Sequence, residues 1–167
     1  KLASQLYEGL AQFDIELFSF YPYEIAEKHM GKISNKIINR VLPSYLNSKI
    51  SEELLSRVEL HKPDIVCIVK GYFITPNTLK KIKSKGIKLI NYNPDHPFKL
   101  SVNQMAYNIR NSVHLYDFYL TYSKRREQEI LAKYPKMHTA IIPFEYHSAY
   151  VDNLKESQDI QAVCFIG

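Results

Sequence analysis

The chain has 167 residues, of which 46% are hydrophobic and 23% are charged, and its formal net charge is +5. These totals are typical of one globular domain, or of one domain and part of another, with enough apolar residues to bury a core. They exclude a helix-bundle membrane protein, because no apolar run approaches the roughly 20 residues that a membrane-spanning helix needs.

The basic residues are spread along predicted helices and form no recognisable nucleic-acid-binding module. We therefore expect no nucleic-acid partner. The positive net charge is compatible with binding of phosphorylated ligands or with peripheral contact with an anionic membrane. The two cysteines, Cys67 and Cys164, fall inside apolar runs. Buried free thiols in a reducing compartment are expected rather than a disulfide, and the expected location is cytoplasmic.

The first third of the chain predicts helices around a single strand. Leucines at helical spacing in 2–13 indicate a helix, and alternation in 14–20 indicates a strand. Residues 24–61 show no strand pattern and predict two helices, the second opening near Ser51 and ending before Pro63. A doubly wound domain normally has a strand before its first helix, so we expect a first strand upstream of Lys1, in a longer protein.

A strand–helix–strand unit follows. The apolar run 64–69 predicts a strand buried on both faces, and 87–90 predicts the next strand. Between them, Thr75 and Pro76 are suited to cap and begin a helix, and Gly86 is suited to end it through a left-handed residue.

The last third predicts an irregular, lid-like loop after Phe98 and then alternating helices and strands. The expected elements are a helix around 104–112, a strand over 115–121, a helix over 124–134 and a strand over 139–142. Ser123 is placed to cap the helix 124–134, with Glu127 close to the capping-box position.

The expected domain boundaries come from the polar stretch near the end of the chain. Residues 1–151 are expected to form one domain and 152–160 a linker. The apolar run within 161–167 ends in a glycine, so this segment is expected to be the first strand of a second α/β domain.

The predicted fold class is therefore α/β: a Rossmann-like, doubly wound parallel sheet with helices on both faces. Lys70-Gly71-Tyr72 and the segment 91–98 each follow a strand directly. Strands of a right-handed strand–helix–strand unit end at the same edge, where open α/β sheets bind ligands. If the expected first strand separates 14–20 from 64–69, the strand order reverses beside Lys70, and we predict that this edge is the functional face.

Several segments together resemble the amino-terminal domain of GT-B-fold glycosyltransferases, in the spore-maturation-protein (CgeB-type) group. They lie between Leu60 and Gly167 and read HKPDIVCIVKGYFITPNTLKKIKSKGIKLINYNPDHPF, YDFYLTYSKRREQEIL, IIPFEYH and AVCFIG. The resemblance implies the amino-terminal half of a GT-B architecture, in which two Rossmann-like domains face each other across a cleft. This chain would supply the acceptor-side domain, and a second domain outside it would hold most of the nucleotide-sugar donor.

The resemblance implies transfer of a sugar from a nucleotide-diphosphate sugar to a hydroxyl of a carbohydrate or another acceptor, with no metal and no cofactor. Such a transfer needs an aligned acceptor hydroxyl, a base for its proton and stabilisation of the leaving diphosphate. The base is expected in this domain, with Asp95 the first candidate and His96 the second. The expected substrate-binding residues are Lys70, Gly71, Tyr72, Asn93, Phe98, Tyr122, Ser123, Phe144 and Tyr146.

Each candidate also has a purely structural interpretation. Asp95 lies between two prolines and could cap a turn, since Asn-Pro-Asp is common turn chemistry. Lys70 ends a buried strand and could pair with a substrate phosphate, pair with Asp95 or extend to solvent. Gly71 is expected to allow a close backbone approach or a left-handed turn. Tyr72 and Tyr122 could form a platform for sugar rings or simply cover the core.

Two other functional classes are compatible with the same patterns. One is a binding module with two Rossmann-like or flavodoxin-like domains that holds a small ligand without chemistry. The other is a scaffold protein that keeps the fold and has lost catalysis. No metal-ligand spacing, dinucleotide-binding glycine motif or serine nucleophile elbow is present in the sequence.

Overall fold

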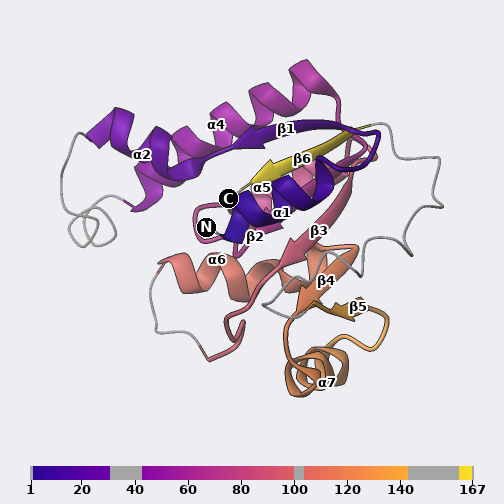
Figure 1. Cartoon of the computed structure of the whole chain (residues 1–167). Coiled ribbons are helices and arrows are strands. Elements are labelled where there is room, and N and C mark those ends of the chain that lie inside the picture. The colour runs from indigo at the N-terminus through magenta and orange to yellow at the C-terminus, as the bar shows by residue number, and fades with distance from the viewer. Residues whose placement is uncertain (1, 31–42, 100–103, 143–161, 167) are drawn as a thin grey trace.

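The computed structural model describes residues 2–30, 43–99, 104–142 and 162–166. These residues form one parallel sheet of six strands in the order β1-β6-β2-β3-β4-β5, with β1 and β5 at its two edges (Figure 1). The α/β class and the parallel, Rossmann-like arrangement predicted from the sequence are therefore confirmed.

The elements follow the chain in alternating order. The first are α1 (Leu2–Leu10), β1 (Glu16–Phe20), α2 (Pro22–Met30), α4 (Pro43–His61), β2 (Ile65–Val69) and α5 (Pro76–Lys83). After these come β3 (Lys88–Tyr92), α6 (Gln104–Ser112), the 3-10 turn η1 (Val113–Leu115), β4 (Phe118–Thr121), α7 (Lys124–Lys133), β5 (His138–Ile141) and β6 (Ala162–Ile166).

Helices cover both faces of the sheet, as the alternation of side chains along β2 shows. Val66 and Ile68 point into a large core shared with α4, α5 and α7. Cys67, between them, points to the opposite face and packs against Leu6 and Leu10 of α1. Cys67 is buried, as expected for a residue of an apolar strand.

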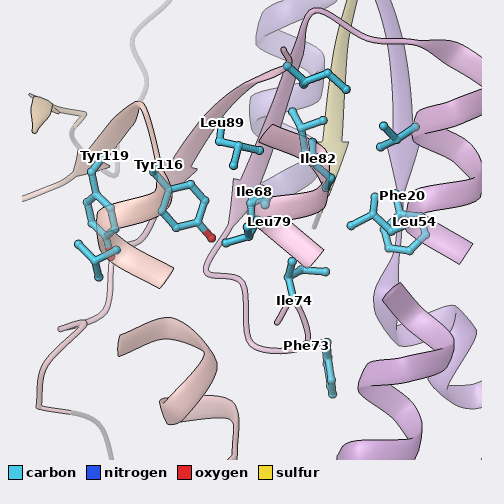
Figure 2. Close-up of a cluster of buried hydrophobic side chains, with 14 of the residues drawn as sticks. Phe20, Leu54, Ile68, Phe73, Ile74, Leu79, Ile82, Leu89, Tyr116 and Tyr119 are labelled. Carbon is cyan, nitrogen blue, oxygen red and sulfur yellow. The ribbon is translucent and has the colours of Figure 1, made fainter. Parts of the chain in front are cut away.

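Figure 2 shows the main core, in which side chains from the sheet meet those of α4 and α5. Leu54 of α4 and Leu79 and Ile82 of α5 are fully buried against Ile68 and Leu89 of the sheet. Tyr116 and Tyr119 extend this core beneath the carboxyl ends of the strands. A rigid base of this kind fixes the loops that follow β2 and β3.

The local signals around α5 are confirmed. Thr75 has extended backbone, and its hydroxyl accepts the N–H of Thr78 at 3.1 Å. Pro76 is the first helical residue, where its missing N–H costs nothing. Gly86 has φ +85°, the left-handed conformation expected after the helix.

Two helix starts differ from the expectations. The second helix of 24–61 begins at Pro43 and not near Ser51, because proline is favoured in the first turn of a helix. Ser123 occupies the cap position of α7, but its side chain makes no capping hydrogen bond. Glu127 does not complete a capping box either, since its carboxylate accepts the Thr139 hydroxyl at 2.9 Å.

The strand β6 lies in a position that the sequence did not predict. A strand was expected between β1 and β2, and this position is occupied by Ala162–Ile166. Residues 162–166, expected to be the first strand of a second domain, pair with β1 and β2 in this sheet. Five apolar residues are suited to this position, where both neighbours offer backbone hydrogen-bonding groups that would otherwise be unpaired. The expected linker 152–160 lies outside the described residues.

Within the described ranges, no helix combines the length and the apolar character needed to cross a membrane.

Candidate functional site

The chain leaves β2 through a strained turn at Lys70. The N–H of Gly71 donates to the carbonyl of Val69 at 2.8 Å, and Lys70 between them has φ +63°. A hydrogen bond from the N–H of residue i+2 to the carbonyl of residue i defines a γ-turn. A positive φ at the central residue makes it the rarer, strained form. For a residue with a Cβ this conformation costs on the order of 1–3 kcal/mol, and such strain concentrates at functional sites.

Gly71 has both features expected from the sequence: a left-handed backbone conformation and close contact of its backbone with neighbouring side chains. Its φ is +91°, and a Cβ at this position would lie 3.2 Å from both Ile68 Cγ2 and the Tyr116 hydroxyl. The backbone of Asn108 lies on α6, and its side-chain amide donates to the Tyr72 carbonyl at 2.8 Å, which holds the segment after Gly71 in place.

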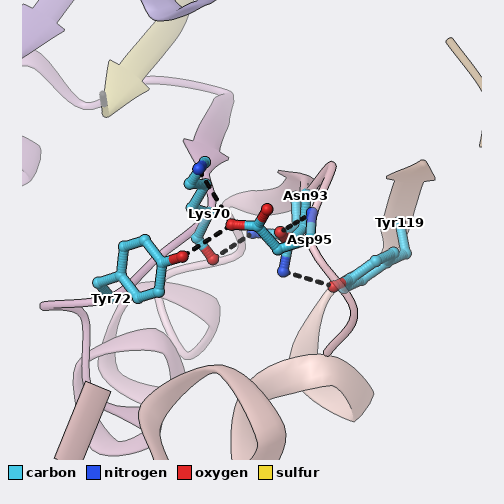
Figure 3. A network of polar contacts seen from close by, with 6 residues as sticks. Lys70, Tyr72, Asn93, Asp95 and Tyr119 are labelled. Atoms are coloured by element: carbon cyan, nitrogen blue, oxygen red, sulfur yellow. Dashed lines mark hydrogen bonds and ion pairs between the residues drawn. The ribbon is translucent and has the colours of Figure 1, made fainter. Parts of the chain in front are cut away.

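Asp95 is the centre of a polar network that joins the loops after β2 and β3 (Figure 3). Its Oδ2 accepts a hydrogen bond from the Tyr72 hydroxyl at 2.7 Å and lies 3.0 Å from Lys70 Nζ. Among the described residues, Oδ1 of the same carboxylate has no hydrogen-bond or ion-pair partner. The side chain is 36% exposed, so a ligand can approach this oxygen.

Asn93 connects Asp95 to the core. Its Oδ1 accepts the backbone N–H of Asp95 at 2.9 Å, and its Nδ2 donates to the Tyr119 hydroxyl at 3.1 Å. Asn93 is fully buried, and its own N–H donates to the Leu120 carbonyl at 3.0 Å. The turn chemistry expected of Asn-Pro-Asp is therefore present, and it positions the carboxylate of Asp95.

The electrostatics of this network keep Asp95 ionised and Tyr72 protonated. Partial burial alone would raise the pKa of the Asp95 carboxyl, but the Tyr72 hydrogen bond and the Lys70 charge outweigh burial and hold this pKa below its usual range. Burial, and then the neighbouring carboxylate, raise the pKa of Tyr72. Tyr72 is therefore a hydrogen-bond donor at neutral pH.

His96 has a polar neighbour at each ring nitrogen. The Phe98 N–H donates to Nδ1 at 3.2 Å, so the proton of the neutral ring lies on Nε2, which is 2.8 Å from Glu129 Oε2. Burial, and then the charge of Arg126, lower the pKa of His96 below its usual value. In this arrangement the ring joins the 96–98 loop to α7, and its buried Nε2 is not accessible to a substrate.

Tyr122 and Ser123 lie where β4 ends and α7 begins. The guanidinium carbon of Arg126, one turn into α7, lies 5.8 Å from the centroid of the Tyr122 ring. Since β3 lies between β2 and β4 in the sheet, Tyr122 belongs to a different strand end from Tyr72, along the same edge. The two tyrosines therefore come from separate parts of this edge.

Phe98 packs inward. It is partly buried beside the main core, close to Tyr134, and Lys133 Nζ lies 4.6 Å from the centroid of its ring. The other two expected substrate-binding residues, Phe144 and Tyr146, lie outside the described residues. The structure thus brings Lys70, Tyr72, Asn93 and Asp95 into one network, whereas Phe98 packs against the core.

Three residues of this region were not among the sequence candidates: Asn108, Arg126 and Glu129. Arg126 belongs to a basic run that has the appearance of a solvated helix face, and nothing in the local pattern distinguishes it. Asn108 and Glu129 act through contacts between separate elements, which no spacing rule reveals. In the described ranges, no group of three or more His, Cys, Asp or Glu side chains is arranged to hold a metal ion.

Comparison of the chain with protein-family models and with curated proteins found no match to either.

Proposed function

We propose that this chain is the acceptor-side domain of a GT-B-type glycosyltransferase, with Asp95 as the general base. The observation that carries the proposal is the state of the Asp95 carboxylate at the carboxyl edge of the sheet. One of its oxygens is held by Lys70 and Tyr72, and the other has no partner among the described residues. A fixed, ionised carboxylate with one available oxygen is suited to accept a proton.

In the proposed step, the acceptor hydroxyl approaches Asp95 Oδ1 and gives it the proton as the oxygen attacks the anomeric carbon of the donor. The new carbon–oxygen bond forms while the bond to the diphosphate breaks, and the nucleoside diphosphate leaves with the bonding electrons. The donor is a nucleotide-diphosphate sugar bound mainly by a second domain outside this chain. A base on the acceptor side implies direct displacement, and hence inversion at the anomeric carbon.

The test uses the longest natural form of the protein that contains this chain. A panel of uridine, guanosine, thymidine and cytidine diphosphate sugars is offered with candidate acceptors, and nucleotide release is measured. Asp95→Asn should lower turnover by about 10²–10⁴-fold and leave the far-UV circular dichroism and the unfolding temperature near those of the wild type. Asp14→Asn, the same change at an exposed position, is the matched control. Undiminished turnover in Asp95→Asn would remove this residue from the mechanism.

A non-catalytic binding or scaffold protein of the same fold is the second candidate, and the Lys70–Asp95 ion pair favours it. A carboxylate whose pKa lies below its usual range is a weaker base than an unperturbed one. The same pair could instead recognise a polar ligand without chemistry. Tight binding of a free small molecule, without nucleotide release from any donor, would support this alternative.

A further inference from the structure

Arg126 breaks the local rules for a residue in the first turn of a helix. The positive end of the helix dipole lies there and favours anions, yet α7 opens with Lys124, Arg125 and Arg126. Ser123 provides no side-chain hydrogen bond to the first-turn N–H groups, so these donors lack the usual cap. Sequences that violate local preferences in this way do so mainly at functional sites.

One guanidinium nitrogen of Arg126 also lacks a hydrogen-bond partner. Its Nη1 is completely buried and has no hydrogen-bond partner among the described residues. A buried, charged N–H group without an acceptor is costly, and native structures seldom leave one in that state. The neighbouring Arg125 differs, because its Nε lies 3.4 Å from Glu129 Oε1 and its side chain is 78% exposed.

Arg126 belongs to the same edge of the sheet as the Asp95 network. Its charge contributes to the lowered pKa of both Asp95 and His96, which places it within electrostatic reach of the two. Its guanidinium lies over the ring of Tyr122, which orients it without neutralising it. A planar group held in this way is suited to bidentate recognition of a phosphate or a carboxylate.

We infer that Arg126, oriented by Tyr122 at the start of α7, binds an oxyanion of the phosphate or carboxylate class carried by the acceptor. One anion would satisfy the buried guanidinium nitrogen, the uncapped N–H groups and the helix dipole together. Assigning the anion to the acceptor rests on the proposed function. The presence of an anion site does not depend on the proposed function, since it is argued from the buried Nη1, which has no hydrogen-bond partner among the described residues.

The experiment measures binding to the whole chain, without donor or turnover, so its result does not depend on glycosyl transfer. Inorganic phosphate, glycerol 1-phosphate and lactate are titrated by calorimetry at low ionic strength. We expect the wild type to bind at least one of these three anions saturably. Arg126→Gln should bind the same anion at least about tenfold more weakly. Arg125→Gln, which removes the same charge from the same helical turn, should weaken it by no more than about twofold. Equal losses in the two variants, or no saturable binding by the wild type, would overturn the site.

Two further measurements test whether the anion belongs to the donor and whether Arg126 has a structural role. Uridine and guanosine diphosphate are titrated in parallel, and binding that depends on Arg126 for these nucleotides alone would assign the anion to the donor, against the proposal. In phosphate-free buffer, Arg126→Gln should unfold at the same temperature as the wild type or higher, because it removes a charged group whose buried Nη1 has no hydrogen-bond partner in the described part of the chain. A marked fall in unfolding temperature would give Arg126 a structural role instead.

Discussion

Lys70 Nζ lies 3.0 Å from Asp95 Oδ2, so an ion pair joins the loops that follow the neighbouring strands β2 and β3. Both side chains are 36% exposed, and a pair of this exposure adds little to stability. The effect of the ion pair is local. Together with the Tyr72 hydroxyl, Lys70 holds Oδ2 of Asp95 in place and keeps the Asp95 carboxylate ionised. The strained turn at Lys70 places the cation where it can do so.

Tyr72→Phe should move the acid limb of the pH–activity profile to higher pH. The Tyr72 hydroxyl donates to Asp95 and helps to lower the pKa of its carboxyl. Without that bond the folded-state pKa of Asp95 rises, so the base becomes protonated at a higher pH than in the wild type. The measurement is kcat/KM against pH, with an expected shift of up to about one pH unit.

The matched control for this prediction is Tyr107→Phe, which removes a hydroxyl from an exposed tyrosine of α6 and should leave the profile in place. A Tyr72→Phe profile that coincides with that of the wild type would show that the titrating group is not Asp95.

Much of this arrangement could be predicted because it depends on neighbours in sequence. Thr75-Pro76 and Gly86 bracket α5 through local backbone preferences, and the parallel strand–helix–strand unit brings Lys70 and Asp95 to one edge. The pairing of Lys70 with Asp95 was one of three alternatives, and the structure contains this pair. The role of Gly71 followed from the same reasoning.

What the sequence could not supply depends on contacts between distant segments. Nothing local distinguishes Arg126 from Arg125, and only the packed helix shows that Arg126 has a buried guanidinium nitrogen while the Arg125 side chain is exposed. The position of β6 depends on the two strand edges available to it, which are set by the sheet and not by the apolar run itself. The start of α4 at Pro43 was not predicted, because the sequence pattern placed the opening of this helix near Ser51.

Gly71→Ala should destabilise the protein more than Gly86→Ala. Both glycines have positive φ, so both changes carry a backbone cost of about 1 kcal/mol. A Cβ on Gly71 would also press against Ile68 Cγ2 and the Tyr116 hydroxyl at 3.2 Å, whereas one on Gly86 would meet nothing within 4 Å. We expect a loss of about 2–4 kcal/mol for Gly71→Ala, measured by urea unfolding.

Gly86→Ala is therefore the control for the backbone conformation alone. Equal losses at the two glycines would show that the contacts around Gly71 relax without cost, and that only its φ constrains the residue.

Asp117→Asn should destabilise the protein at neutral pH and much less in acid. Asp117 Oδ2 accepts the Leu89 N–H at 2.9 Å, and Oδ1 lies 3.0 Å from Lys83 Nζ. Partial burial alone would raise the pKa of Asp117, but the Leu89 N–H and then Lys83 outweigh burial and lower it. A carboxyl whose folded-state pKa is lowered stabilises the protein above its unfolded-state pKa of about 3.9, and this contribution is lost as pH falls through the folded-state value.

The measurement is the free energy of unfolding in urea for the wild type and Asp117→Asn between neutral pH and the acid limit of folding. We expect a difference of about 1–2 kcal/mol at pH 7 that shrinks as pH falls below about 4. Asp14→Asn, at an exposed position, should show little difference at any pH. A difference for Asp117→Asn that is constant with pH would mean that the neutral hydrogen bond to Leu89, and not the charge beside Lys83, stabilises the junction between β3 and β4.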